Sequence, residues 1–218
     1  MLLKDKLPSK LGEIMNLDKL KQAEASFLSR YPEGFWHPDM QDIAKKHKME
    51  KMISFTQESM AKQNFDYPHD IVENLNKIVS RSSMVSMFEK PKFRDFIKSL
   101  NQGERELLAQ GMQKRLHGNK QEGFEVLLDI FSRDKLAKWS LISICPTYFD
   151  PQNEVFVKPT TAKGVIEFFE LDTLVYKPRP SWDFYAEYQS IINTMKTHVD
   201  SSLSPNSAAF SGFLMMSL

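Results

Sequence analysis

Hydrophobic residues recur at intervals of three and four positions along most of the chain, which is the period of an amphipathic α-helix. Between these stripes the chain is polar, as expected where helices face solvent. The clearest stripes are Met49, Met52, Ile53, Thr56 and Met60; Leu107, Leu108, Gly111, Met112 and Leu116; Phe124, Leu127, Leu128 and Phe131; and Trp182, Tyr185, Tyr188, Ile191, Ile192, Met195 and Val199. The pattern predicts a mainly α-helical protein.

Prolines and helix-stop residues fall between the stripes, where a missing backbone amide costs least. Pro38 and Pro68 are each followed closely by an aspartate, so both are predicted to lie in the first turn of a helix. Pro91 is expected to interrupt a pattern that could otherwise run from Ile71 toward Leu100. His117-Gly118-Asn119 is typical of a helix end followed by a turn.

Two short segments, residues 154–158 and 174–177, have the composition of strands, and each ends in a Lys-Pro pair. A pair of short strands is only marginally stable. We therefore expect a single multi-helix domain over residues 1–218 with a minor extended or β element near residues 154–178. The stretch 146–153 interrupts the helical pattern, so a weak subdivision is also predicted, with a helical body over 1–145 and a C-terminal section over 146–218 packed on it.

Composition places the chain among ordinary globular proteins, with 41% hydrophobic and 26% charged residues. Its single cysteine excludes an internal disulfide and fits a reducing compartment. The N-terminal residues mix charges with apolar residues, unlike a secretory signal, and no stretch has the length of a membrane span. We expect a cytoplasmic protein that does not associate with membranes.

The 29 basic and 28 acidic residues are interspersed, so no domain-wide basic surface for nucleic acid is expected. The densest local positive charge lies in residues 81–98, together with Phe88, Phe93 and Phe96. These rings could stack on bases, which keeps nucleic acid as a weakly supported partner. The spacing of Phe93, Phe96, Ile97 and Leu100 on one helical face instead favours core packing.

Residues 158–163, Lys-Pro-Thr-Thr-Ala-Lys, form the first candidate site. Free amides and hydroxyl groups in the first turn of a helix can bind an anion, and lysines on either side would strengthen the attraction. The candidate side chains are Lys158, Thr160, Thr161 and Lys163. The glycine-rich loop of nucleotide-binding enzymes is absent. The simpler interpretation, which the pattern favours, is that Thr160 or Thr161 only caps the following helix while the lysines are solvated.

The second candidate is the segment 177–182, Lys-Pro-Arg-Pro-Ser-Trp. Arg179 lies between two prolines that restrict the backbone, so it could bind a carboxylate or phosphate at a low entropic cost, with Trp182 as a flat neighbouring surface. The alternative, again favoured, is a rigid connector that ends at a Ser181 cap, with Trp182 in the core.

No catalytic, metal or cofactor signature is found, and no cofactor is expected. Cys145 lies among apolar residues and is predicted to be an unreactive buried thiol. The five histidines show no metal-binding spacing. The absence of a catalytic constellation favours a protein that is not an enzyme.

The C-terminal residues are strongly apolar and follow a good helix start at Ser204-Pro205-Asn206. Phe210, Phe213, Met215 and Met216 must be covered, either by this protein's own core, which we favour, or by a protein partner or second copy in a homodimer.

Four segments, 137–141, 155–160, 176–182 and 208–213, resemble in their order an uncharacterised bacterial protein family of unknown function. The resemblance covers about residues 135–218. It implies a bacterial origin and one structural unit that contains these segments, and it implies no activity.

The leading hypothesis is a non-catalytic binding or interaction module with an anion-contacting turn, which could serve nucleic-acid processing or regulation. A second hypothesis is an enzyme that acts on a phosphorylated or carboxylated small molecule, with Asp183, Glu187 or His198 as a titratable group in a pocket at this turn. A third is a structural subunit that uses its C-terminal helix as an interface.

Overall fold

The computed structural model describes residues 15–218, and this part of the chain folds into α-helices and short 3-10 helices without any strand. None of the helices in this range combines the length and apolarity needed to cross a bilayer. The elements are α1 (Leu17–Arg30), η1 (Gly34–Trp36), α2 (Pro38–Lys46), α3 (Met49–Ser59), η2 (Lys62–Asp66), α4 (Pro68–Arg81), α5 (Glu89–Ser99), α6 (Gln102–His117), α7 (Lys120–Arg133), α8 (Trp139–Phe149), α9 (Pro159–Phe168), α10 (Trp182–Lys196), η3 (Ser201–Leu203) and α11 (Ser207–Met216). The predicted mainly α-helical class is confirmed.

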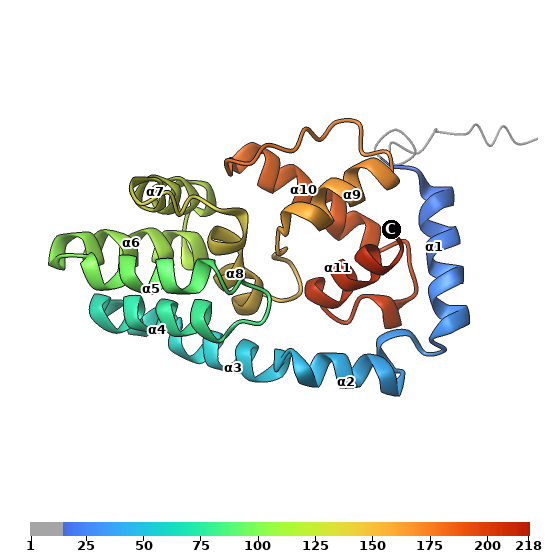
Figure 1. Cartoon of the computed structure of the whole chain (residues 1–218), viewed down its shortest axis with the longest axis horizontal. Coiled ribbons are helices and arrows are strands. Elements are labelled where there is room, and N and C mark those ends of the chain that lie inside the picture. Colours follow the sequence, from blue (N-terminus) through green and yellow to red (C-terminus); the bar gives the residue numbers. More distant parts are fainter. Residues whose placement is uncertain (1–14) are drawn as a thin grey trace, which may run out of the picture.

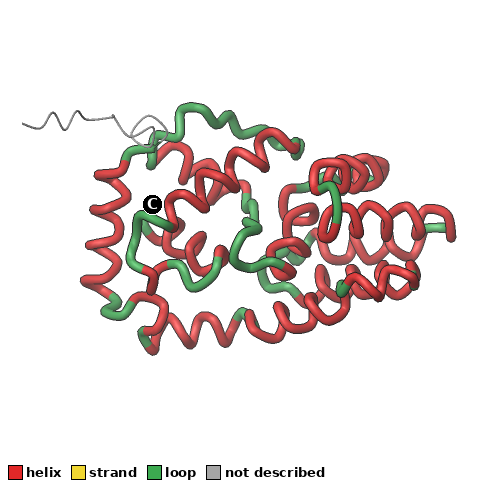
Figure 2. The backbone as a smooth tube through the Cα atoms, turned by 180° about the vertical axis from the view of Figure 1, so that it is seen from behind, coloured by secondary structure: helices red, strands yellow, loops and turns green. Residues whose placement is uncertain are grey.

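The helices form two groups along the long axis of the molecule (Figures 1 and 2). Helices α4 to α7 gather at one end, α1 stands at the other, and α9 and α11 lie between α1 and the centre. Helices α2 and α3 follow one another along one edge and connect the two groups. The irregular segment 150–158 runs through the middle, between α8 and α11.

The helix boundaries follow local signals in the sequence. Pro38 and Pro68 occupy the first turns of α2 and α4, as predicted. The side chain of Asn119 caps α7 and accepts a hydrogen bond from the Glu122 amide, directly after α6 ends at His117. Asn206 caps α11 in the same way. The interruption expected at Pro91 corresponds to the gap between α4 and α5, with Pro91 in the first turn of α5.

Helix α8 is the centre of the core, because every residue from Trp139 to Tyr148 is buried. A helix that is apolar on all sides can be stable only where other elements surround it. One continuous core extends from Trp139 on this helix to Tyr185 on α10 and Phe213 on α11. Residues before and after the predicted boundary at 146–153 therefore share this core.

Two predictions for the C-terminal half are wrong. Residues 154–158 and 174–177 form no β element, because no partner strand pairs with them and their backbone groups bond to side chains or to nearby turns. The Val157 amide, for example, donates to Ser143 Oγ (3.1 Å), and the Lys177 carbonyl accepts from Trp139 Nε1 (2.8 Å). Pro146 does not end a helix either; it lies inside α8, which continues to Phe149.

Helices α6 and α7 approach closely because Gly123 has no side chain. A Cβ atom at this position would lie 2.2 Å from the Arg115 backbone nitrogen. We expect Gly123→Ala to force the two helices apart and to cost about 1–3 kcal/mol of unfolding free energy. For a chain of this size this corresponds to a fall in Tm of roughly 2–12 °C.

The matched control is Gly103→Ala, since Gly103 is exposed in the first turn of α6 and a Cβ there meets no atom closer than 3.6 Å. This variant should be as stable as the wild type or slightly more stable, because alanine reduces the entropy of the unfolded chain. Thermal unfolding of both variants measures the difference. Equal midpoints would contradict the close packing at Gly123.

Candidate functional site

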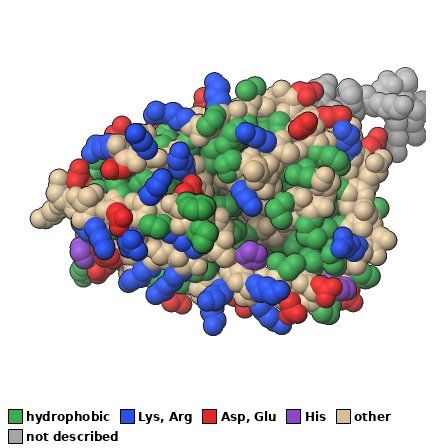
Figure 3. Space-filling view, viewed as in Figure 1, with side chains coloured by type: hydrophobic (Ala, Val, Ile, Leu, Met, Phe, Trp, Pro, Cys, Tyr) green, Lys and Arg blue, Asp and Glu red, His purple; other side chains and the backbone are tan. Residues whose placement is uncertain are grey.

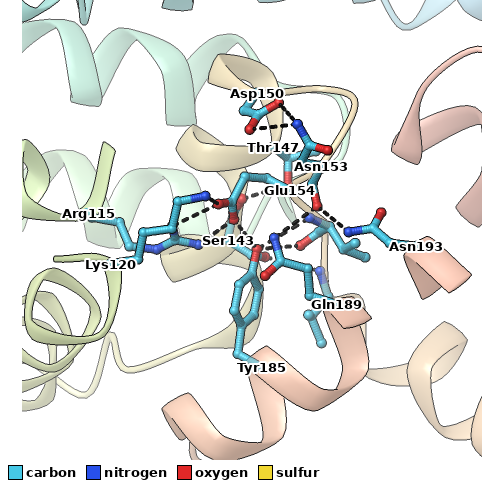
Figure 4. A network of polar contacts seen from close by, with 12 residues as sticks. Arg115, Lys120, Ser143, Thr147, Asp150, Asn153, Glu154, Tyr185, Gln189 and Asn193 are labelled. Carbon is cyan, nitrogen blue, oxygen red and sulfur yellow. Dashed lines mark hydrogen bonds and ion pairs between the residues drawn. The ribbon is translucent and has the colours of Figure 1, made fainter. Parts of the chain in front are cut away.

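Two groups of polar or concave features stand out: a buried network around Glu154 and an apolar pocket beside the turn at Lys158. The network joins α6, α7, α10 and the segment 150–158 (Figure 4). Arg115 and Glu154 form its centre, with side chains only 1% and 2% exposed. The guanidinium is bidentate: Arg115 Nη1 lies 3.0 Å from Glu154 Oε1, and Nη2 lies 2.5 Å from Oε2.

Two further groups complete the coordination of the carboxylate. Lys120 Nζ donates to Glu154 Oε1 (2.7 Å), and the Tyr185 hydroxyl donates to Oε2 (2.7 Å). Each carboxylate oxygen thus accepts two hydrogen bonds. The Arg115 guanidinium also lies over the aromatic rings of Tyr185 and Trp182, at 5.1 and 5.7 Å from their centroids.

These contacts fix the charge of Glu154. Burial by itself raises the pKa of this carboxyl, but hydrogen bonds and the positive charge from Arg115, with hydrogen bonds from Lys120 and Tyr185, lower its pKa to about 2. Burial and the neighbouring Glu154 carboxylate raise the pKa of Tyr185 far above its usual range. Both groups keep one protonation state near neutral pH.

The network is built for structure and not for proton transfer. A general acid or base needs a free position for the proton and contact with a substrate. Glu154 has all its acceptor positions in use, and neither Arg115 nor Glu154 nor Tyr185 lines the pocket described next. The pair instead holds the segment 150–158 against α6, α7 and α10.

The second feature is an apolar pocket of about 310 Å³. Figure 3 shows hydrophobic side chains gathered around a hollow near the middle of one face of the molecule. Residues of α2 and α11 form the two long walls, while the starts of α3 and α9 contribute at their first turns. The lining consists of Phe35, Met40, Ile43, Ala44, His47, Met49, Ser83, Met84, Phe156, Lys158, Thr161, Asn206, Ala208, Ala209, Ser211, Gly212, Met215 and Met216.

Small residues on α11 create the space. Ala208, Ala209 and Gly212 present little side-chain volume, and a Cβ atom on Gly212 would meet only the Phe35 ring, at 3.7 Å. Across the pocket Met40 is fully buried, whereas Met215 and Met216 are 47% and 42% exposed. Methionines can adapt their shape to a bound molecule, because their side chains are unbranched and have three rotatable bonds.

The polar groups of the pocket are few. Ser211 Oγ is buried and has no hydrogen-bond partner among the residues that the structure describes. The His47 ring contacts Ser83 through Nδ1 and Oγ (2.7 Å). Within residues 15–218 the other ring nitrogen of His47 has no hydrogen-bond partner, so this pair lacks the third, orienting group of a catalytic triad.

The charged side chains that line the pocket are positive. Among residues 15–218, Lys158 is the only lysine or arginine in the lining, and no aspartate or glutamate lines the pocket. Lys158 is also the N-cap residue of α9, and no side chain caps this helix. The first-turn amides at Thr160 and Thr161 consequently have no side-chain acceptor, and they lie at the positive end of the helix dipole.

This geometry corrects the prediction for the Lys158–Lys163 turn. A cap by Thr160 or Thr161 is wrong, because Pro159 takes the first helical position and places both threonines inside the first turn. Lys158 and Thr161 line the pocket, whereas Thr160 and Lys163 are exposed outside its lining. Lys163 lies over the Tyr176 ring, 5.1 Å from the centroid.

The second predicted segment lies apart from the pocket. Arg179 is exposed in the loop between α9 and α10 and does not line the pocket. Trp182 packs its ring against Phe124 and over Arg115. The structure thus brings two of the six proposed anion-contacting residues to one cavity and places the other four elsewhere.

The structure also bears on the other candidate residues from the sequence. Phe93 and Phe96 are buried in the core, as the helical spacing predicted, so their rings cannot stack on bases, whereas Phe88 is 77% exposed. Cys145 is buried as predicted, and burial raises its pKa to about 12. Among residues 15–218 no group of histidine, cysteine and acidic side chains could hold a metal ion. Asp183, Glu187 and His198, the proposed titratable groups, do not line the pocket.

Comparisons of the chain with models of protein families, with curated proteins and with solved structures find no match.

Proposed function

We propose that the protein is a non-catalytic binding module that holds a small, largely apolar molecule in the pocket between α2 and α11. The observation that supports it most strongly is the pocket itself. Its volume of about 310 Å³ lies within the range of small-molecule sites, and its lining is apolar with a few polar groups, as such sites usually are. A molecule in this space would cover Met215 and Met216.

Three features favour binding over catalysis. The one histidine of the lining has no orienting partner, the buried Glu154 carboxylate has no free acceptor position, and Cys145 is inert. Met215 and Met216 also adjoin the other apolar residues of the lining, so they belong to a continuous apolar surface that a ligand could cover.

Filling the pocket tests this function. We expect the neutral apolar dye 1-aminonaphthalene, which is small enough for the pocket, to bind saturably at one site, with increased fluorescence. Gly212→Leu should place a side chain in the cavity, because Gly212 lines the pocket and a Cβ there would meet only the Phe35 ring, at 3.7 Å. This variant should weaken dye binding about tenfold or more, the change expected when well over 1 kcal/mol of apolar contact is lost.

Gly103→Leu is the control, since it makes the same substitution at an exposed position on α6. It should leave dye binding unchanged, and circular dichroism should show both variants folded. Equal affinities of wild type and Gly212→Leu would refute the pocket as the binding site.

A further inference from the structure

The polar and charged groups at the pocket indicate which chemical class of molecule it would hold; this inference rests on the proposed binding function. The lining contains a lysine and a histidine but no acidic side chain. Among residues 15–218 no carboxylate lies within salt-bridge distance of Lys158, which lines the pocket. A cation would meet only like charge here, whereas an anion would meet uncompensated positive charge.

The start of α9 supplies directional hydrogen-bond donors for that anion. Lys158 provides an ammonium group, and the uncapped first turn provides backbone amides next to Thr161, which lines the pocket. No acidic residue lies in this first turn to compete for the amides. Anions bind at helix N-termini through these groups.

The rest of the pocket fits a flexible aliphatic chain. A cavity of about 150 Å³ holds one benzene molecule, so a pocket of about 310 Å³ has room for about eight to twelve carbon atoms. Its walls are formed by methionine, phenylalanine and alanine side chains along α2 and α11. Methionines at such a surface adapt to chains of variable conformation better than branched side chains do.

We propose that the pocket binds an aliphatic monocarboxylate of about eight to twelve carbon atoms, with its carboxylate at Lys158 and the first turn of α9 and its chain between α2 and α11. A free medium-chain fatty acid has this chemistry. The carboxylate would complete the helix start that no side chain caps, and the chain would cover the exposed methionines.

Isothermal titration calorimetry at neutral pH with decanoate, decanol and decyltrimethylammonium tests the charge preference. We expect decanoate to bind about tenfold or more tightly than decanol, because charge-assisted hydrogen bonds are stronger than neutral ones. The ammonium compound should bind more weakly than decanol. Hexanoate should lose affinity relative to decanoate because it fills less of the pocket.

The variant Lys158→Met should reduce the affinity for decanoate about five- to tenfold and leave that for decanol unchanged. Lys163→Met is the matched control: it removes the same charge from the same helix but outside the pocket, so both affinities should stay at the wild-type value.

The outcomes separate the two proposals. Equal binding of decanol and decanoate, or an equal loss for Lys158→Met and Lys163→Met, would overturn the carboxylate assignment while the apolar pocket stands. Binding to phosphatidylglycerol vesicles without binding of decanoate would overturn it as well. If neither decanoate nor decanol binds and the neutral dye does not either, the binding function itself is wrong.

Discussion

Replacing Glu154 by glutamine should lower the free energy of unfolding by about 3–5 kcal/mol, because the change leaves the Arg115 guanidinium buried without a counter-charge. Both side chains are almost fully buried, so water cannot solvate the remaining charge. Lys120 is half exposed and loses only one contact. Urea or thermal unfolding of wild type and variant measures the effect.

Two comparisons isolate the cause. Glu170→Gln removes a carboxylate that pairs with Lys19 at 2.9 Å on the exposed surface, and its unfolding midpoint should remain close to that of the wild type. The double variant Arg115→Met with Glu154→Leu removes both buried charges, and it should recover part of the stability lost in Glu154→Gln. A single variant as stable as the wild type would show that the pair does not hold the segment 150–158 in place.

The pH dependence gives a second test of the same pair. The pKa of Glu154 is about 2 in the folded protein against an ordinary value of 4.5. A lowered folded-state pKa contributes stability that is fully present above the unfolded value and is lost as the pH falls toward the folded value. The stability difference between wild type and Glu154→Gln should therefore be constant near neutral pH and shrink from about pH 4.5 down to about pH 2.

Phe213→Ala should be the second large loss, at about 3–5 kcal/mol, because it leaves a cavity in the core. Phe213 is fully buried, with its ring centroid 5.4 Å from that of Phe27 on α1 and 5.6 Å from that of Phe210. Phe213 thus connects α11 with α1, two helices that lie near opposite ends of the sequence. Phe210 and Phe213 therefore cover this protein's own core, as favoured from the sequence, and are not free to contact a partner.

Met216→Ala on the same helix is the matched comparison, since Met216 is 42% exposed and lines the pocket. Its stability should stay within about 1 kcal/mol of the wild type. Chemical unfolding, together with light scattering, checks both variants. If Phe213→Ala kept its stability and changed only the molecular mass in solution, α11 would be an interface between chains.

Much of the fold was predictable because helix signals are local. The three-to-four spacing identified the helices, and Pro38, Pro68 and Asn206 marked the starts of three of them. The errors also have local causes: residues 154–158 have the β-branched and aromatic composition of a strand, but the backbone finds side-chain partners instead of a second strand. Composition alone cannot tell whether an extended segment will pair with another strand or with side chains.

The buried ion pair was missed, although one signal was present. Arg115 follows Leu108, Gly111 and Met112 at helical spacing, so it belongs to the buried stripe of α6. A charged residue in such a stripe implies a buried counter-charge. Its partner Glu154 lies 39 positions away, however, and nothing local identifies which acidic residue that partner is.

The pocket could be anticipated only in part. The turn at Lys158 was identified as polar and basic, and Lys158 and Thr161 do line a cavity. The opposite walls come from α2 and α11, which are far apart along the chain. The chain contains 12 methionines, but their number does not locate the pocket, because packing of distant helices decides which methionines remain exposed.

The most direct test of the central claim is nuclear magnetic resonance of protein labelled with ¹³C at the methionine methyl groups, titrated with decanoate. The chain has 12 methionines, and our account predicts saturable shifts for those that line the pocket and none for the fully buried ones elsewhere. The lining methionines are Met40, Met49, Met84, Met215 and Met216, and the internal controls are Met52, Met60, Met112 and Met195. Shifts confined to the first set would confirm the site, whereas unchanged spectra, or shifts in the control set alone, would contradict it.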